Sequence, residues 1–274
     1  MPVPLSSPRI GSLLMGGLLS ISSSAALAQS PATTLQVYAA GSLREPLTAI
    51  ASAYEAQTGL KLSLTFGASG LLRERIEKGE SAQVFASADN QHPATLAASR
   101  TRWQAPTVFV SNALCALTAP AVQASPASLL DVLLDPAVRL GTSTPLNDPS
   151  GDYTWALFRK AEMLQTGAFA RLDAKAIKLT GYADAPKPPA GRGTYAWLMS
   201  EGRADVFLTY CTNALSASKE VAGLNVVALP TGLQVSAAYG VTARTGDAAA
   251  VQFTSYLLSA PAQKVFASFG FGPP

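Results

Sequence analysis

Two hydrophobic periods alternate in the first third of this chain. One stretch repeats apolar residues at the spacing of a helix face and then stops at a glycine, through Leu47, Ile50, Ala51, Tyr54 and Gly59. Apolar runs at 35–40, 60–66 and 82–89 have the β-branched and aromatic composition of strands. A second helical stretch carries Leu72 and Ile76 and ends at Gly79. The resulting order, βαβαβ, predicts a parallel sheet with helices on its faces.

The rest of the chain continues this alternation. Strands are predicted at 137–142, 174–180, 204–211, 224–230 and 233–243. Helices are predicted at 127–134, 151–164, 194–202, 247–258 and 261–268. One sheet does not comfortably hold so many βα units, so the pattern predicts an α/β fold with two lobes. We expect one lobe from 31–110 plus 236–274 and the other from 111–235.

Composition narrows the class of protein. The chain has 274 residues, of which 48% are hydrophobic and 14% charged, enough for a large core. Its formal net charge is only +3, and its lysines and arginines are scattered. No basic run interleaved with aromatic residues points to a nucleic-acid partner.

The first 28 residues have the pattern of a secretory signal peptide. A lone Arg9 precedes an uncharged apolar stretch, and Ala26, Leu27 and Ala28 supply a cleavage site before Gln29. A retained membrane anchor is the weaker interpretation, since the apolar part is short and rich in serine. We therefore expect a mature protein exported to the periplasm.

Export changes the interpretation of the two cysteines. Cys115 and Cys211 would meet an oxidising compartment, where paired cysteines usually form a disulfide. The alternative is two unlinked cysteines packed as small hydrophobic residues. A reactive thiol is disfavoured, because His92 is the only histidine of the chain.

Four turns rich in small residues precede predicted helices. Ser42 follows the first strand, Ser69 follows the second, Ser150 lies in "PSGDYTW", and Arg192 lies in "AGRGTYAW". Open α/β sheets bind ligands at such strand ends, and free N–H groups at a helix start suit an anion. Each turn alone is more often an ordinary helix cap, and Ser42 with Glu45 fits a capping box. An alternative start at Pro46 leaves Ser42 in the loop.

No catalytic or metal-binding constellation is visible. One histidine excludes a multi-histidine metal site, and nucleophile-elbow, Walker and H-E-x-x-H motifs are missing. Other polar and aromatic residues have simpler explanations than a functional site. Helix caps and solvated faces explain Asp89, Asp148, Asp152 and Asp205. Arg44, Arg73 and Arg75 lie at exposed helix positions that favour solubility, and Tyr153 and Trp155 are explained by core packing. We expect no enzyme activity and no cofactor.

Five stretches carry a resemblance to a known family: "VYAAGSL", "FGASGLLRERIEKGESAQVFASAD", "DPSGDYTWALFRKAE", "EGRADVFLTYCTNA" and "LLSAPAQKVFASFGFGPP". The mature chain resembles, nearly end to end, the periplasmic molybdate-binding proteins of ABC importers. The resemblance implies the two-lobed periplasmic binding protein fold of type II. Each lobe would hold a mostly parallel sheet flanked by helices, with crossing strands between the lobes and the ligand in the cleft.

The resemblance also implies a set of ligand-binding residues. Ser42 and Ser69 match the serines of the family's first and second turns, and Ser150 matches a position that donates its backbone N–H. Arg192 falls at another backbone donor, although Gly191 is an alternative, and Tyr210 matches a tyrosine whose hydroxyl reaches the ligand. Arg192 replaces the family's usual small or apolar residue, and Cys211 after Tyr210 is not general in the family. A bond from Cys211 to Cys115 would brace Tyr210.

The function implied is capture of molybdate or tungstate, as an oxyanion, for the membrane permease of an ABC importer. A monomer is the default expectation. The first alternative keeps the fold but binds sulfate, phosphate or a small organic anion, for which Arg192 is the best support. A secreted enzyme on the same fold is a less favoured third hypothesis.

Overall fold

The computed structural model describes residues 1–5, 7, 34–99 and 102–274. Arg9 and the cleavage motif of the predicted signal peptide lie outside these residues. Residues from 34 onward belong to one compact unit. Within the described residues, no helix combines the length and the apolar character that a membrane span requires.

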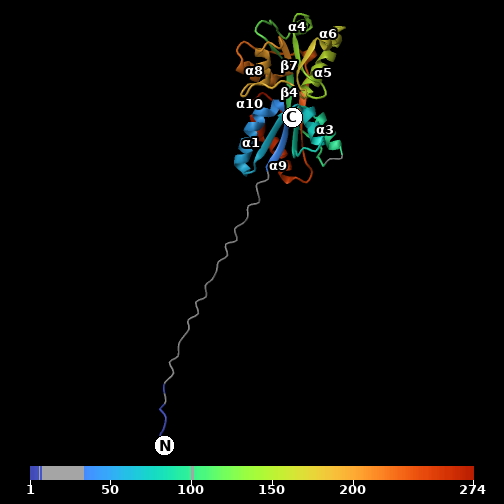
Figure 1. The fold of residues 1–274 in the computed structure, drawn as a ribbon. Helices are drawn as coiled ribbons and strands as arrows, with labels where there is room; N and C mark the ends of the chain where they lie inside the picture. Colours follow the sequence, from blue (N-terminus) through green and yellow to red (C-terminus); the bar gives the residue numbers. More distant parts are fainter. Residues whose placement is uncertain (6, 8–33, 100–101) are drawn as a thin grey trace. The chain divides into compact units, whose positions relative to one another are not determined.

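Parallel strands form the two ends of the sheet, and antiparallel strands form its middle (Figure 1). At one end, β1 (Leu35–Ala40) lies between β2 (Leu62–Gly67) and β3 (Val84–Ser87), and all three are parallel. At the other end, β5 (Leu140–Ser143) lies parallel to β6 (Ala176–Thr180) and to β7 (Val206–Tyr210).

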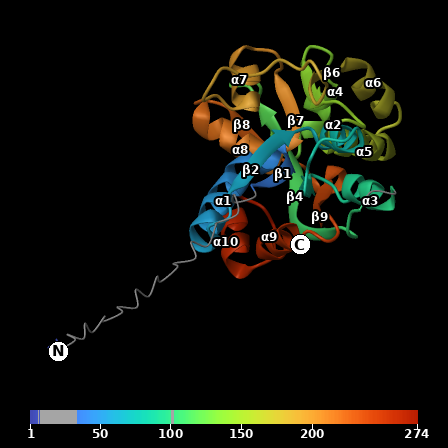
Figure 2. The ribbon, with the colours of Figure 1, turned by 60° about the horizontal axis from the view of Figure 1, so that its bottom comes forward.

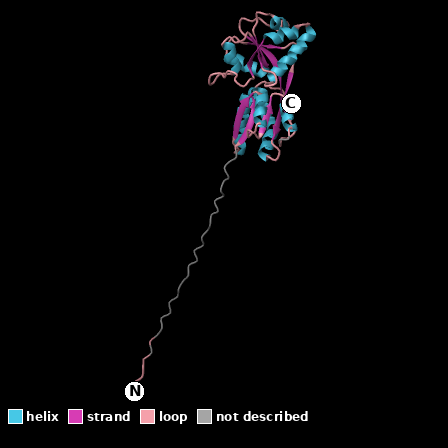
Figure 3. Ribbon diagram, turned by 45° about the vertical axis from the view of Figure 1, so that its right-hand side comes forward, coloured by secondary structure: helices cyan, strands magenta, loops and turns pink. Residues whose placement is uncertain are grey.

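Two long strands join these ends. β9 (Ser236–Ala243) runs antiparallel to β3, and β4 (Thr107–Thr118) runs antiparallel to β9. Figure 2 shows β4 and β9 side by side. The second part of β4 then pairs with β7 and with β8 (Asn225–Ala228), both antiparallel. β4 therefore belongs to both halves of the sheet, which Figure 3 shows as two groups of strands. The predicted lobe boundaries fall inside β4 and directly before β9, and they stay a prediction.

Helices cover both halves of the sheet. The first half carries α1 (Arg44–Thr58), α2 (Ser69–Glu77), α3 (Gln91–Ala98), α9 (Ala248–Leu257) and α10 (Ala260–Ser268). The second carries α4 (Leu129–Leu134), α5 (Pro149–Leu164), α6 (Ala168–Lys175), α7 (Thr194–Ser200) and α8 (Cys211–Glu220). Short 3-10 turns occupy Gly41–Leu43 and Thr231–Leu233. The predicted α/β architecture is confirmed.

The helix α1 shows how the hydrophobic pattern becomes packing. Its apolar positions Leu47, Ile50 and Tyr54 are all at most 2% exposed, and they belong to the main hydrophobic core. Gly59 ends the helix in the left-handed conformation, with φ of 75°, which glycine adopts without a Cβ penalty. Both the buried face and the stop are confirmed.

Three helices were missed by the sequence pattern: α3, α6 and α8. The buried residues of α8 are small or polar, namely Thr212, Ala214 and Ala217, so its apolar periodicity is weak. The strand predicted at 174–180 begins at Ala176 instead, because α6 continues to Lys175. Helix α6 buries only Ala168 and Leu172, which is too little for a periodic signal.

Candidate ligand-binding site

A cavity of about 1080 Å³ is lined by residues from both halves of the sheet. Ser42, Ser69 and Ala88 contribute from turns that follow β1, β2 and β3. Gly181 and Tyr210 contribute from the ends of β6 and β7. The cavity therefore lies where the carboxyl ends of parallel strands meet, the place that open α/β sheets use for ligands.

Ser42 lies in a 3-10 turn between β1 and α1, and its hydroxyl is 2.9 Å from the hydroxyl of Tyr239. The capping box is wrong, because Ser42 makes no cap hydrogen bond and α1 begins at Arg44. The alternative start at Pro46 is also wrong, because α1 begins two residues earlier, but Ser42 does lie outside the α-helix, in the 3-10 turn. Its side chain is thereby kept at the cavity wall.

Ser69 is the first residue of α2 and is 1% exposed. Its hydroxyl oxygen accepts a 3.1 Å hydrogen bond from the backbone N–H of Ala88. A hydroxyl that accepts in this way still has its own proton to donate. Ser69 can therefore act as a fixed donor toward the cavity.

Tyr210, the last residue of β7, is 2% exposed, and its hydroxyl donates to the carbonyl of Ala88 at 3.4 Å. The ring packs between those of Tyr153 and Tyr239, with centroids 6.3 and 5.5 Å away. Burial raises the pKa of Tyr210 well above its ordinary value. The hydroxyl is therefore neutral at physiological pH and remains a hydrogen-bond donor.

Ser150 does not line the cavity; it is fully buried in the first turn of α5. Its backbone N–H donates to Asp148 at 3.1 Å, and its hydroxyl is buried without a hydrogen-bond partner in the described chain. Asp148, rather than Ser150, lines the cavity. Its side chain caps α5, as predicted from the sequence. Its position beside the cavity was missed, because a capping aspartate has the same sequence signal wherever it lies.

Burial raises the pKa of the Asp148 carboxyl above its ordinary value of 3.8. Hydrogen bonds from Ser143 and from the N–H of Ser150 act in the opposite direction. The carboxyl is thus an acceptor beside hydroxyl donors, which suits a ligand that itself carries a proton or a hydroxyl group.

Gly191 and Arg192 both line the cavity. The backbone N–H of Arg192 donates to the carbonyl of Pro189 at 3.1 Å. Its guanidinium group pairs with Glu220, which also accepts from the N–H of Gly193 at 2.8 Å. The positive charge of Arg192 therefore has a carboxylate partner already, which weakens the support it gave to a strongly acidic ligand.

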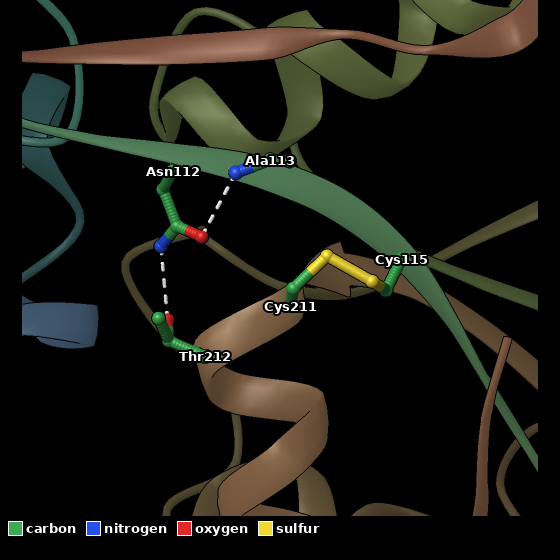
Figure 4. Close-up of a disulfide and its surroundings, with 5 residues drawn as sticks. All are labelled: Asn112, Ala113, Cys115, Cys211 and Thr212. Carbon is green, nitrogen blue, oxygen red and sulfur yellow. Dashed lines mark hydrogen bonds between the residues drawn. A yellow bond between two sulfur atoms is a disulfide. The ribbon is translucent and has the colours of Figure 1, made fainter. Parts of the chain in front are cut away.

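A chain of hydrogen bonds connects the two halves behind the cavity. The Tyr239 hydroxyl that contacts Ser42 also accepts from the Asn112 amide at 3.4 Å. The same amide group donates to the hydroxyl of Thr212 at 2.9 Å (Figure 4). A disulfide joins Cys115 of β4 to Cys211, which directly follows Tyr210 (Figure 4). The disulfide therefore fixes the first residue of α8, next to Tyr210, to β4.

Two further hydrogen bonds join the two halves. The N–H of Gly70 in α2 donates to the carbonyl of Asn147 at 2.8 Å, and Ser216 of α8 donates to Glu45 of α1 at 3.0 Å. Ser69 and Asp148, the neighbours of the first pair, and both members of the second pair line the cavity. These bonds therefore hold the two halves together beside the cavity.

Two arginines have a place that the sequence did not predict. Arg44 and Arg75 are exposed, as expected, and both also line the cavity. Tyr153 is packed against the core as expected. Within residues 34–99 and 102–274, no group of histidine, cysteine, aspartate and glutamate side chains could hold a metal ion.

Comparison with solved structures defines the class of fold. The periplasmic molybdate-binding protein of Azotobacter vinelandii superposes with a TM-score of 0.71 at 19% identity, over 88% of this chain and 99% of that one. Peb3 of Campylobacter jejuni with bound L-phospholactate has a TM-score of 0.68 at 18% identity, over 88% and 100%. The fold is that of the two-lobed periplasmic binding proteins.

Sequence comparison then gives the family. The model of the bacterial extracellular solute-binding protein family matches residues 35–272, and the chain belongs to this family. An uncharacterized protein of Pasteurella multocida is 37% identical over 87% of this chain and 98% of its own length. A molybdate-binding protein of Mycobacterium tuberculosis is 26% identical over 99% of both chains. The family consists of transport receptors that supply ABC importers, rather than enzymes.

Proposed function

We propose that the chain is an exported receptor that captures a small oxyanion, with molybdate or tungstate as the first ligand, and delivers it to a membrane permease. One observation carries this proposal. Three residues that carry hydroxyl groups, Ser42, Ser69 and Tyr210, come from three separate strand ends and line one cavity. The 26% identical molybdate-binding protein of Mycobacterium tuberculosis supports the choice of ligand.

Neutral donors suit a dehydrated dianion. Each charge-assisted hydrogen bond contributes about 1.5–3 kcal/mol, and fixed dipoles need no mobile cation in the cavity. Molybdate and tungstate have nearly the same size, so we expect similar affinities. Sulfate is smaller and would leave donors at poor distance. Residues 1–28 are proposed to act as a cleaved signal peptide, and the mature protein to act in the periplasm as a monomer.

Calorimetric titration of the purified protein with molybdate, tungstate, sulfate and phosphate tests the proposal. Ser42→Ala and Ser69→Ala should each lower molybdate affinity by about tenfold or more. The matched control is Ser52→Ala, since Ser52 lies on the exposed side of α1 and bonds only to Thr48. Unchanged molybdate affinity in both cavity variants, or equally tight sulfate binding, would refute molybdate as the ligand.

A second candidate is the same receptor with a phosphorylated or carboxylated organic ligand. Two observations favour it. The cavity of about 1080 Å³ is slightly larger than the range of about 300–1,000 Å³ that is usual for pockets of drug-sized molecules. The backbone N–H groups of Ser150 and Arg192 were expected to bind a free oxyanion. They instead donate hydrogen bonds to the Asp148 carboxylate and to the Pro189 carbonyl. The L-phospholactate of the Peb3 neighbour supports this class of ligand. Tighter binding of an organic phosphate than of molybdate would select it.

A further inference from the structure

The positive charges around the cavity differ in whether a carboxylate neutralises them. Three cavity-lining cations have partners: Arg75 pairs with Glu80, Lys78 with Glu74 and Arg192 with Glu220. Two others, Arg44 and Lys187, have no carboxylate oxygen of the described residues within 4.0 Å. Glu45 and Asp148 line the same cavity and have no cationic partner of the described residues within this distance, so the cavity carries unpaired groups of both signs.

Arg44 is the cation whose position is fixed. Its guanidinium carbon lies 4.6 Å from the centroid of the Phe66 ring, a cation–π contact that orients the side chain. Phe66 lines the same cavity. A guanidinium stacked on a ring keeps its in-plane N–H groups free, and these match the two oxygens of a carboxylate or phosphate.

The place of Arg44 relative to Ser42 gives the second argument. Arg44 follows Ser42 by two residues, across the turn that leads from β1 into α1, so both belong to one wall. The hydroxyl of Ser42 is at the buried end, beside the fully buried Tyr239, whereas Arg44 is exposed. A cavity of about 1080 Å³ has room for a ligand that reaches from one to the other.

We propose that Arg44 binds a second acidic group of an organic ligand whose oxyanion group lies against Ser42 and Ser69. This inference rests on the proposed function as a receptor for small oxyanions, and it names the ligand class: a short organic phosphate that also carries a carboxylate. Asp148, an acceptor on the cavity wall, would receive a hydrogen bond from a hydroxyl group between the two acidic ends.

The experiment compares three probes by calorimetric titration: phosphoglycerate, which has both acidic groups, glycerol phosphate, which lacks the carboxylate, and molybdate. The protein is used as wild type, as Arg44→Gln and as Arg203→Gln. Arg203 is another exposed arginine and lies outside the cavity lining, so its variant controls for net charge.

We expect phosphoglycerate to bind wild type more tightly than glycerol phosphate does. Arg44→Gln should lower phosphoglycerate affinity by about tenfold to a hundredfold and leave glycerol phosphate affinity unchanged, while Arg203→Gln changes neither. Equal affinity of wild type and Arg44→Gln for phosphoglycerate would overturn the inference. Binding of molybdate alone would also overturn it but would leave the proposed function intact. If none of the three probes binds, both are refuted.

Discussion

The backbone N–H of Gly70 donates a 2.8 Å hydrogen bond to the carbonyl of Asn147, and this bond joins the two halves of the molecule. Gly70 lies in the first turn of α2, and Asn147 lies in the loop that leads into α5. A Cβ on Gly70 would stand 2.4 Å from the carbonyl oxygen of Leu146 and 2.7 Å from that of Asn147. Only glycine permits this approach, because backbone atoms cannot move aside as a side chain can.

The first prediction follows from this contact. Gly70→Ala should lower ligand affinity by about tenfold or more, because overpacking costs roughly 1–3 kcal/mol and here acts on a contact between the two halves that form the cavity. Calorimetric titration with the best-binding anion measures the affinity. Gly232→Ala is the matched control, since its Cβ would meet only the flexible end of the Leu164 side chain. Wild-type affinity in Gly70→Ala would show that the contact has no part in binding.

The second prediction concerns the partly buried hydrogen bond between Tyr239 and Ser42. Tyr239→Phe removes the hydroxyl that contacts both Ser42 and Asn112. We expect the free energy of unfolding to fall by about 1–3 kcal/mol, because buried polar groups lose a partner. Urea denaturation of this variant, of Ser42→Ala and of the double variant measures it. The two single effects should not add, and strict additivity would contradict a direct bond.

The third prediction concerns the disulfide between Cys115 and Cys211, which closes a loop with a sequence separation of 96. Replacing both cysteines by serine should lower the free energy of unfolding by about 2–4 kcal/mol, because the unfolded chain regains freedom. Urea denaturation with and without a thiol reductant measures the effect. Reductant should shift the wild-type midpoint and leave that of the double variant unchanged. An unshifted wild-type midpoint would contradict a stabilising bond.

The fourth prediction is a pH dependence at Glu80. Hydrogen bonds from Arg75 and then from Tyr38 lower the pKa of Glu80 from 4.5 to about 2. A carboxyl whose pKa is lowered by folding stabilises the protein above its unfolded pKa and loses that contribution as the pH falls toward the folded pKa. The stability difference between wild type and Glu80→Gln should therefore be constant above pH 4.5 and should shrink between pH 4.5 and about 2.

Urea denaturation at a series of pH values measures this difference. Arg75→Gln serves as the control, because Arg75 donates two hydrogen bonds to Glu80 at 2.8 and 2.7 Å. Without these bonds, the same comparison made in the Arg75→Gln background should show a weaker pH dependence. A stability difference that stays constant down to pH 2 in wild type would contradict the lowered pKa of Glu80.

Local patterns predicted much of this molecule. The face of α1 with Leu47, Ile50 and Tyr54 was readable because its periodicity reports burial directly. The stop at Gly59 was readable because the left-handed conformation favours glycine. Helix α8 could not be predicted in this way, because its buried residues are small or polar. Its position is fixed by β4 and the disulfide.

The sequence alone determined the α/β class and the strand ends that lead to Ser42, Ser69 and Tyr210. It also favoured a disulfide between Cys115 and Cys211 over two unlinked cysteines, and the structure contains this bond. The tertiary structure decided the partners: Tyr239 for Ser42, Glu220 for Arg192 and Asp148 for the N–H of Ser150. The reason is physical. Periodicity and turn chemistry depend on neighbours along the chain, whereas a hydrogen bond or ion pair between residues far apart in sequence exists only after the sheet has placed its strand ends together.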